Sequence, residues 1–593
     1  MERLRSYLLR FSRASFPEVL YRVRQKVLHT LIKRGIVWPR MTADSTHKVK
    51  DLKMPSLELD TEVAAVDTIL SGHRCTLNND ISRLNDFHRN TMNMFSKDIS
   101  IDGPDIRSVW EPARLQHIST LVAWLQVCND AAENERIKAF IREEVLTWIT
   151  ENPFLLGPHY MCTMECGLRI PVLFFCLKVL DNLAWNEESM ISRSLYEHAW
   201  WVSKNLSLYS SLGNHTICEC IGLIFGGAVF RHTVKGNGWL ELGRSLLDEE
   251  IHNQILEDGG PAEQSLSYHR LVLDLCWLAC DFLEKNRLHD CSNIKARLGL
   301  GESFLLSFSD EHGYFPSIGD SDDGYAIAPS VRPRRSIPAA NNQGMTIHRK
   351  SGCSVVRLAE SFMMTFDHGP LGMQPLYNHG HADALSITLG CDGTQMLVDP
   401  GTCRYNGEPV WRSYFKGSRA HNTVTIDGFD QAVQLTGFIW DRPYEAFLTD
   451  AHEGSGRYSL SAYHTGYERL KGPVRHTRSI EVLEHSILSI TDSFTGKGEH
   501  GYELNFHVHP EASLEKDGVW WIIRRDGMAC TLRLEGGEDF QVVTGQDRPP
   551  LGWYSPSYGI RVPCSVLTCR KTGIPSEVIF VTTICTVPHK GVE

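Results

Sequence analysis

The spacing of hydrophobic residues changes along the chain and predicts where helices give way to strands. Between positions 108 and 308, apolar residues recur every three or four positions, as at Ile118, Leu121, Val122 and Leu125. This spacing places them along one side of an amphipathic helix. The pattern predicts helices over 115–125, 137–150, 166–181, 190–203, 215–230, 238–256, 265–284 and 293–308. Gly, Pro or Asn residues separate these segments, so we expect antiparallel helical hairpins stacked in an array or ring.

Beyond about position 344 the hydrophobic pattern becomes the short alternation typical of strands. The stretch 328–344 is rich in Pro, Arg, Ala and Asn and has no periodicity, so we predict a linker there. Predicted strands include 353–358, 384–389, 423–426, 479–483 and 578–583. Because no helices alternate with them, these strands favour an antiparallel sandwich over a parallel sheet.

The two patterns together predict an α+β protein of several domains. A chain of 593 residues is longer than one hydrophobic core usually supports. We expect a basic N-terminal helical extension over 1–50, a helical domain over 51–335 and a β-sandwich domain over 336–593.

Composition and charge narrow the functional classes. The formal net charge is -11, whereas nucleic-acid-binding proteins usually carry a basic domain, so nucleic acid is not an expected partner. The 17 cysteines are scattered along the chain and form no Cys-x-x-Cys pair. Free buried thiols are therefore expected rather than a disulfide scaffold, and they favour a reducing compartment.

The N-terminal segment is basic but does not resemble a signal peptide. Residues 1–40 contain ten Lys or Arg against two Glu, without a continuous apolar run. No stretch elsewhere is long enough to span a membrane as a helix. These features favour a cytoplasmic location. The basic segment 21–27 suits peripheral contact with an anionic membrane, and the alternative is a solvated helix packed on its own domain.

The densest group of reactive side chains lies in three neighbouring segments, 378–386, 398–402 and 420–423. In an extended strand, side chains two residues apart share a face, so His379, His381 and Asp383 would point the same way. Alternating Leu385 and Ile387 continue this pattern and favour a strand over a helix. Two imidazoles and a carboxylate from separate segments can bind a divalent metal, leaving a third imidazole for proton transfer.

Several motifs carry a resemblance to a known family. They are Trp110-Glu111-x-x-Arg114, Met164-Glu165-x-x-x-Arg169, Asn214-His215-Thr216, Glu263-Gln264-Ser265-x-x-Tyr268-His269, Phe366-Asp367-x-Gly369-Pro370, His379-Gly380-His381-Ala382-Asp383, Val398-Asp399-Pro400-Gly401-Thr402 and His421-Asn422-Thr423-Val424. In number, order and spacing they resemble the heparinase II/III-like polysaccharide lyases. The resemblance covers about 108–430. It implies an incomplete (α/α) toroid followed by a C-terminal antiparallel β-sandwich, and β-elimination on a uronate-containing glycan.

The resemblance also implies roles for individual residues. Asn214, aided by His215, would hydrogen-bond the substrate carboxylate and make the proton at C5 easier to remove. Tyr268 would be the base, the acid or both, with its pKa lowered by a cationic site. His379 would be the second proton-transfer group, and the family places such residues together at an interdomain cleft.

A metal site is implied as well. His381, Asp399 and His421 would bind a divalent metal of mainly structural importance, with zinc expected and calcium as the alternative. Four further residues are candidates for substrate binding: Glu263, Arg412, Arg419 and Asn422. The two arginines adjoin the site segments and offer bidentate contacts to a carboxylate or sulfate.

Plainer interpretations stand beside these roles. Tyr268 would serve equally as a packed helical tyrosine, and Asn214 as a helix N-cap. Asp399 would suit the start of an Asp-Pro-Gly turn, and His421 would suit a hydrogen bond to the backbone. For His379 the rival role is metal binding beside His381.

Two rival functions remain open. A glycoside hydrolase on the same fold would need two carboxylic acids across a cleft, with Glu111, Glu165 and Glu263 as candidates. The second rival is a catalytically silent glycan-binding protein. Without a recognisable secretion signal, the preferred setting is bacterial exopolysaccharide or capsule metabolism, which predicts that heparin is a poor substrate.

Overall fold

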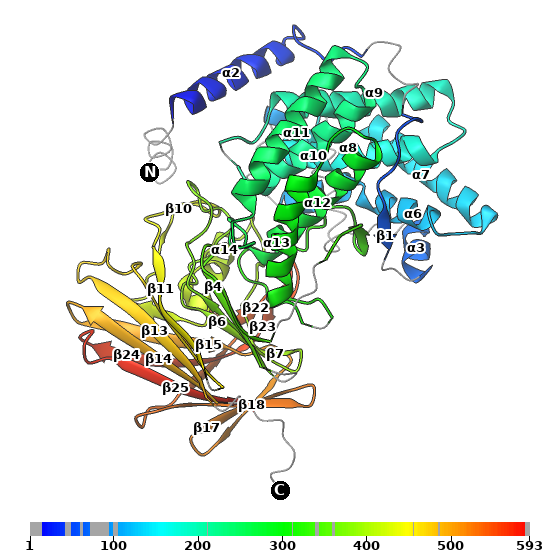
Figure 1. The fold of residues 1–593 in the computed structure, drawn as a ribbon. Helices are drawn as coiled ribbons and strands as arrows, with labels where there is room; N and C mark the ends of the chain where they lie inside the picture. Colours follow the sequence, from blue (N-terminus) through cyan, green and yellow to red (C-terminus); the bar gives the residue numbers. More distant parts are fainter. Residues whose placement is uncertain are drawn as a thin grey trace. The chain divides into compact units, whose positions relative to one another are not determined.

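The chain divides into two compact units whose segments alternate along the sequence (Figure 1). The first comprises Met1–Gln254, Leu271–Leu298 and Tyr325–Ser336, and the second comprises Ile255–Arg270, Gly299–Gly324 and Ile337–Glu593. This computed structural model describes residues 15–41, 49–59, 63–71, 94–98, 105–209, 211–310, 312–337, 343–358, 362–454, 456–483 and 487–586. The division into consecutive domains at positions 50 and 335 stays a prediction.

The first unit is built from helices, drawn from blue to green in Figure 1. They are α2 (Phe16–Lys33), α3 (Val63–Leu70), α5 (Arg107–Trp110), α6 (Gln116–Leu125), α7 (Ala131–Glu151), α8 (Thr163–Val179), α9 (Trp185–Lys204), α10 (Asn214–Val229), α11 (Val234–Gln254), and most of α12 (Leu266–Lys285) and part of α13 (Ser292–Phe308). The helices predicted between 115 and 308 are all confirmed, with ends shifted by a few residues. None of the described helices has the length and apolar character needed to cross a membrane.

Aromatic packing and close helix contacts hold the first unit together. Phe225 of α10 stacks on Phe282 of α12 with ring centroids 4.0 Å apart, and Phe174 of α8 meets both rings at 5.4–5.5 Å. At Gly167 of α8, an added Cβ would lie 2.5 Å from the backbone oxygen of Cys218 on α10. Only glycine therefore allows these two helices to approach so closely.

The predicted linker is partly wrong. Within 328–344, the short strand β2 (Val331–Pro333) pairs antiparallel with β1 (Leu57–Leu59). The two strands are far apart in sequence and only three residues long, so no local alternation could reveal them. The pairing ties the segment to the beginning of the first unit.

The second unit contains three larger antiparallel sheets. The five-stranded sheet has the order β3 (Gly344–His348), β4 (Cys353–Leu358), β5 (Phe362–Asp367), β6 (Ile387–Cys391) and β7 (Thr394–Leu397). The eight-stranded sheet has the order β11 (Ala446–Gly454), β12 (Arg457–His464), β13 (Val474–Leu483), β14 (Ile487–Gly496), β25 (Ile579–Thr586), β18 (Met528–Leu534), β17 (Trp520–Arg525) and β16 (Ser513–Asp517). The four-stranded sheet has the order β19 (Gln541–Thr544), β24 (Ser565–Gly573), β15 (His500–His507) and β8 (Val424–Ile426).

Short elements connect these sheets. The second unit also contains α14 (Pro409–Phe415), β9 (Val433–Gln434), β10 (Trp440–Asp441), β20 (Gln546–Asp547), β21 (Pro550–Leu551), β22 (Trp553–Tyr554) and β23 (Val562–Pro563). The strands predicted around 353–358, 423–426, 479–483 and 578–583 are confirmed. All described cysteines are free thiols, as expected.

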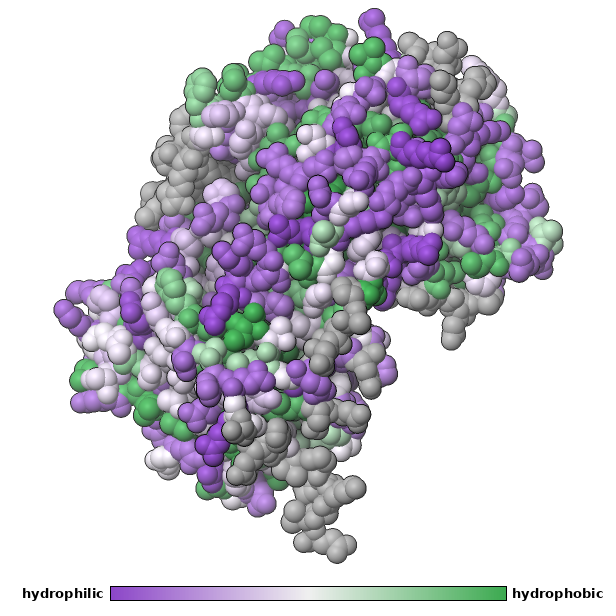
Figure 2. Space-filling model, viewed as in Figure 1, coloured by the Kyte–Doolittle hydropathy of each residue, from purple (hydrophilic) through white to green (hydrophobic). Residues whose placement is uncertain are grey.

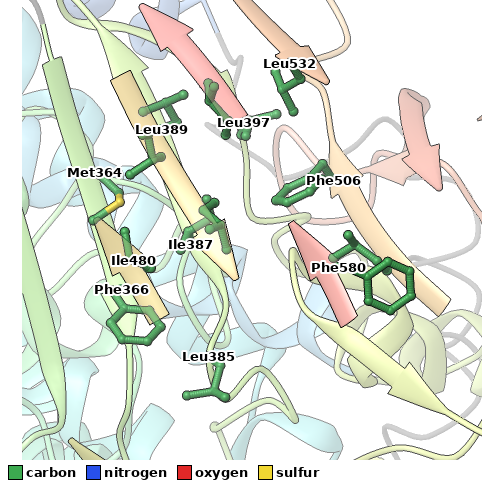
Figure 3. Packing of buried hydrophobic residues seen from close by; sticks show 14 of the residues in the cluster. Met364, Phe366, Leu385, Ile387, Leu389, Leu397, Ile480, Phe506, Leu532 and Phe580 are labelled. Atoms are coloured by element: carbon green, nitrogen blue, oxygen red, sulfur yellow. The ribbon is translucent and has the colours of Figure 1, made fainter. Parts of the chain in front are cut away.

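One hydrophobic cluster joins the three sheets (Figure 3). It includes Met364 of β5, Ile387 of β6, Ile480 of β13, Phe506 of β15 and Phe580 of β25. Along β13 buried and less buried residues alternate, so one face of that strand lies in the cluster. The apolar faces of the sheets thus form a rigid support for the loops that carry the polar residues described next.

Candidate active site

The first turn of α12 is anchored to the loop 316–324. Ser265 Oγ accepts a hydrogen bond from the Tyr268 backbone N–H at 3.2 Å and donates one to the Asp320 carbonyl at 2.6 Å. The Leu266 N–H also donates to the Ile318 carbonyl at 3.2 Å. These bonds satisfy donors that a helix N-terminus leaves open, and they hold Tyr268 beside the acidic residues of the loop.

The Tyr268 hydroxyl lies in a small hydrogen-bonded cluster within the second unit. It donates to Asp322 Oδ2 at 2.6 Å and lies 2.8 Å from the hydroxyl of Tyr405. Tyr405 also donates to Asp322 Oδ2, at 3.2 Å. All three side chains are largely buried. The Tyr268 hydroxyl therefore bonds to a carboxylate and to a second hydroxyl, and the cationic site that the resemblance implied stays a prediction.

The predicted strand through His379 and Asp383 is wrong. The strand β6 begins only at Ile387, and 378–386 is irregular. Leu385 has a left-handed backbone with φ 63°, which ends the extended course that the alternation implied. Gly380 packs so tightly that an added Cβ would lie 1.5 Å from the Leu371 carbonyl oxygen. Tertiary contacts thus outweigh the local pattern here.

His379 nevertheless meets Tyr268, as predicted, although both lie in the second unit. Their ring centroids are 4.3 Å apart, with planes tilted by 50°. His379 Nδ1 lies 3.0 Å from Asp320 Oδ2, and Nε2 lies 3.9 Å from Glu263 Oε1. A carboxylate on Nδ1 fixes the ring and selects the tautomer that carries the proton on that nitrogen. Nε2 is then the basic nitrogen.

The fully buried carboxylate of Asp320 contacts several polar side chains of the site. It accepts two bonds from the Arg412 guanidinium, one of them at 2.9 Å, and one from Thr402 Oγ1 at 3.1 Å. His381 Nε2 lies 3.1 Å from Oδ1. Burial alone would raise the pKa of Asp320, but Arg412 and the two histidines hold it well below its usual range. The carboxylate is therefore ionised when it orients His379.

A second cluster lies next to this network. One possible ligand atom from each of His381, Asp399 and His421 lies within 4.8 Å of the others, and all three residues are buried. Nδ1 of His381 and Nε2 of His421 are buried without a hydrogen-bond partner. Burial lowers the pKa of His381 to about 4, against the opposing effect of Asp320, so its imidazole is neutral. Two imidazoles with unused nitrogens and a carboxylate fit a divalent metal of the zinc type.

Asp383, the carboxylate in the segment 378–386, interacts with Asp367. Burial, together with neighbouring Asp367 and Asp399, raises the pKa of Asp383 well above its usual range. Burial likewise raises the pKa of Asp367 to about 7. Asp367 and Asp383 therefore hold a proton between them, and Asp383 does not join the histidines at Asp320.

The remaining predicted residues have other partners. Arg412 is buried, and its Nε also donates to the Gly437 carbonyl at 2.8 Å. Arg419 pairs with Glu503 at 2.6 Å. Asn422 is buried and donates to the carbonyls of Ile387 and Val398, at 2.8 and 3.0 Å. These contacts hold segments of the second unit together, and the substrate-binding roles of the three residues stay predictions.

Asn214 and His215 lie in the first unit. Asn214 is the first residue of α10, and the N-cap position belongs to Gly213. His215 Nδ1 lies 3.7 Å from Cys162 Sγ. Their roles toward a substrate carboxylate stay predictions.

Three residues of the site escaped the sequence analysis: Asp320, Asp322 and Tyr405. The first two belong to Gly319-Asp320-Ser321-Asp322-Asp323-Gly324, an acidic run between two glycines. That run was the available signal, because clustered carboxylates in a short loop often serve a site. Tyr405 had no such signal, since a lone tyrosine in a loop is common.

Two family models match consecutive parts of the chain. One, described as the heparinase II/III N-terminus, matches residues 126–321, and the other, described as heparinase II/III-like, C-terminal, matches residues 318–581. The chain belongs to the heparinase II/III-like polysaccharide lyase family. A heparin-sulfate lyase from Bacteroides stercoris is 22% identical to this family member over 430 residues, which are 65% of the chain and 59% of that relative. The match thus spans less than two thirds of the relative's length.

Solved structures share the fold of this heparinase II/III-like chain. A crystal structure of heparinase III has a TM-score of 0.66 at 16% identity, covering 95% of this chain and 92% of that one. A heparan sulfate lyase from Pedobacter heparinus has a TM-score of 0.57 at 15% identity, covering 96% and 91%. The likeness shows a helical N-terminal region followed by an antiparallel, sheet-rich C-terminal region. The incomplete toroid and the sandwich stay predictions.

Proposed function

We propose that this protein is a polysaccharide lyase that cleaves an acidic, uronate-containing glycan by β-elimination. One observation carries the proposal: an imidazole oriented by a buried carboxylate lies against the ring of a tyrosine whose hydroxyl is also hydrogen-bonded. Family membership supports the same reaction. In this reaction a base removes the proton at C5, the C4–O bond breaks, a C4=C5 double bond forms, and an acid protonates the departing oxygen.

His379 is the base in this proposal. Asp320 accepts from Nδ1, so the lone pair of Nε2 is available for the C5 proton. The ionised Asp320 also stabilises the imidazolium that forms when the proton arrives, as the carboxylate does in a Ser-His-Asp triad. Arg412 and Thr402 fix that carboxylate in turn, so the base is held in one orientation.

Tyr268 is the acid. Its hydroxyl is protonated and donates to Asp322, and it lies beside the imidazole of His379. On elimination it transfers that proton to the oxygen leaving C4 and then regains a proton from solvent, with the Tyr405 hydroxyl 2.8 Å away holding it in place. Asp322 and Tyr405 are positioning residues, since they orient the Tyr268 hydroxyl.

The carboxylate of the uronate must be neutralised before C5 becomes acidic enough. Asn214 and His215 of the first unit are proposed for this role, carried over from the family motif. Replacement of Asn214 by Asp tests it, because a negative charge opposite the uronate would repel it and abolish turnover.

The metal proposal rests on the unused nitrogens of His381 and His421. His381, Asp399 and His421 would hold a divalent ion, zinc by preference and calcium as the alternative. When bound, the ion supplies a cross-link between three loop segments. His421→Ala should abolish the bound metal in elemental analysis and lower the melting temperature. A wild-type protein purified and dialysed without stoichiometric metal would contradict the proposal.

Hydrolysis is the rival chemistry, and two of its three candidate carboxylates, those of Glu165 and Glu111, are paired with arginines. Glu165 receives two bonds from Arg114, at 2.7 and 2.8 Å, within the first unit. Burial alone would raise the pKa of Glu165, but Arg114 holds it below its usual range, so this carboxyl is a poor proton donor. Glu111 is likewise paired, with Arg107 at 3.2 Å.

The deciding experiment measures the ultraviolet absorbance of unsaturated uronate on a panel of heparosan, heparan sulfate, heparin, chondroitin, hyaluronan, alginate and bacterial exopolysaccharides. We expect a rise with wild type and none with Tyr268→Phe. New reducing ends without a rise in absorbance would show that the protein hydrolyses the glycan and does not eliminate. Binding without turnover on a substrate that the relatives cleave would favour a silent glycan-binding protein. A bacterial capsular setting predicts a faster rate on exopolysaccharides than on heparin.

A model substrate separates the two proton-transfer roles. A uronate with a leaving group at C4 that needs no protonation, such as fluoride, should be cleaved by Tyr268→Phe nearly as fast as by wild type. It should remain inert to His379→Gln, which lacks the base. If the fluoride substrate were cleaved by His379→Gln and not by Tyr268→Phe, His379 would be the acid and Tyr268 the base.

A further inference from the structure

Helix α2 (Phe16–Lys33) presents two opposite faces. One is docked on the first unit: Tyr21 Oη donates to the Leu206 carbonyl at 2.6 Å, Gln25 donates to the Lys204 carbonyl, and His29 Nε2 lies 2.6 Å from Asn205 Oδ1. Ile32 is buried on the same face. These contacts fix the rotation of the helix about its axis, so its other face is directed outward.

The outward face is apolar. Phe16, Leu20, Val23 and Val27 are 79%, 60%, 55% and 55% exposed. They occupy positions i, i+4, i+7 and i+11, which form one stripe along a helix, roughly 16 Å long. Figure 2 shows green hydrophobic residues at the surface where Figure 1 draws α2. A contiguous run of exposed large apolar side chains marks an interaction surface, whereas single ones do not.

Basic residues border this stripe on both sides. At about 100° per residue, Arg24 lies roughly 80° to one side of the stripe and Lys26 roughly 80° to the other. Both side chains are exposed. The helix carries Arg22, Arg24, Lys26 and Lys33 against the single acidic residue Glu18. A locally basic helix thus stands on a chain whose net charge is -11.

We propose that α2 attaches the protein peripherally to an anionic lipid surface. The helix lies in the plane of the interface, with the apolar stripe among the upper acyl chains and Arg24 and Lys26 at the phosphate groups. An apolar stripe flanked by Lys and Arg is the arrangement that such a surface binds. The docked face keeps the rest of the first unit on the water side.

Charge argues against a second copy of the chain as the occupant. A two-fold contact through the stripe would bring the same basic residues of both copies to one rim, where they repel each other. An anionic lipid surface instead neutralises the basic residues on both borders at once. The inference is independent of the proposed enzymatic activity.

The test is cosedimentation of the full chain with vesicles of phosphatidylglycerol and phosphatidylcholine in equal parts, and with vesicles of phosphatidylcholine alone. We expect binding to the anionic vesicles that weakens as salt is raised. The double variant Leu20→Ser with Val23→Ser should lower the partition coefficient about tenfold or more, and so should Arg24→Glu with Lys26→Glu.

The matched control is Val234→Ser with Lys235→Glu on α11, where Val234 is 94% exposed. This variant should bind as wild type does. Circular dichroism and thermal unfolding establish that each variant is folded. The proposal is overturned if wild type fails to sediment, if both vesicle types bind equally, or if the α2 variants bind as wild type does. A stripe variant that changes only the oligomeric state would assign the stripe to a second copy.

Discussion

The second unit contains two buried networks in which an aspartate is paired with an arginine and a histidine. In one, Asp320 binds Arg412 and lies 3.0 Å from His379. In the other, Asp492 of β14 accepts from Arg478 at 2.7 and 2.9 Å and lies 2.7 Å from His476 of β13. Asp320 also accepts from Thr402 and lies 3.1 Å from His381, and of the two networks only this one adjoins the ring of Tyr268.

The two networks differ in what surrounds the histidine. His476 is fully buried and stacks on Phe494 with centroids 5.0 Å apart, and its Nδ1 is buried without a partner. His379 has a polar environment, with the Tyr268 ring at 4.3 Å and the Glu263 carboxylate 3.9 Å from Nε2. Arg478 also donates to the carbonyls of Leu385 and Asn422, at 2.7 and 2.6 Å. We therefore expect the Asp492 network to be scaffolding, and the role proposed for His379 depends on a second ring nitrogen that meets polar groups.

Replacing each histidine by glutamine tests most directly whether only His379 takes part in the reaction. His379→Gln should lower turnover by about 10²–10⁴-fold, because glutamine cannot take the C5 proton. His476→Gln should leave turnover of the folded protein nearly unchanged. Initial rates of unsaturated-uronate formation check this, with circular dichroism as the control for folding. Similar losses in both variants would mean that His379 is scaffolding too.

Replacing the two aspartates by asparagine should separate stability from activity. Each change leaves a buried arginine unpaired and should cost about 3–5 kcal/mol of unfolding free energy. Only Asp320→Asn should also lower turnover, because His379 loses its orientation. Denaturant unfolding curves and rates on the folded fraction measure both quantities. The pH–rate profile gives a second readout of the lost carboxylate. Its acid limb should shift in Asp320→Asn and stay in place in Asp492→Asn.

The hydroxyl cluster around Tyr268 predicts a smaller effect. Tyr405→Phe removes one hydrogen bond to the Tyr268 hydroxyl while keeping the ring, and it should lower turnover roughly tenfold. Asp322→Asn keeps an acceptor in place and should have a similar or smaller effect. The turnover number should fall more than the Michaelis constant changes. Tyr458→Phe on β12, outside this cluster, is the matched control and should behave as wild type.

The smallest effect concerns the pH dependence of stability. Burial lowers the pKa of His476, against the opposing influence of Asp492. Below about pH 6.5 the unfolded chain binds a proton at this residue and the folded chain does not, so stability falls as the pH drops below that value. His476→Gln should make this decline shallower, by at most about 1.4 kcal/mol per pH unit. Urea unfolding between neutral and mildly acidic pH measures the slope, and an unchanged slope would contradict a neutral His476.

Asp492 also makes the folded protein less stable as the pH falls. Burial alone would raise its pKa, but Arg478 and His476 lower it to about 2. Its contribution to stability is complete above about pH 4 and is lost as the pH falls through 2.

The hydrophobic pattern by itself determined much of this protein. Spacings of three and four located the helices of the first unit, and alternation located most predicted strands of the second. These signals are local, because the side of an element that faces the core repeats with the period of that element. The motifs likewise brought Tyr268, His379, His381, Asp399 and His421 to attention, because reactive residue types gathered there in short segments.

Tertiary structure alone decided how those residues are used. The segment after His379 bends at Leu385 despite its strand-like alternation, and Asp320, which orients that histidine, comes from a loop nearly sixty positions earlier. The acidic run around Asp320 marks a candidate site, but only the fold shows that Asp320 pairs with Arg412, 92 positions away. Asp492 instead lies directly opposite Arg478 on the neighbouring strand. Such contacts depend on which loops pack against one another, and the local hydrophobic period does not predict that packing.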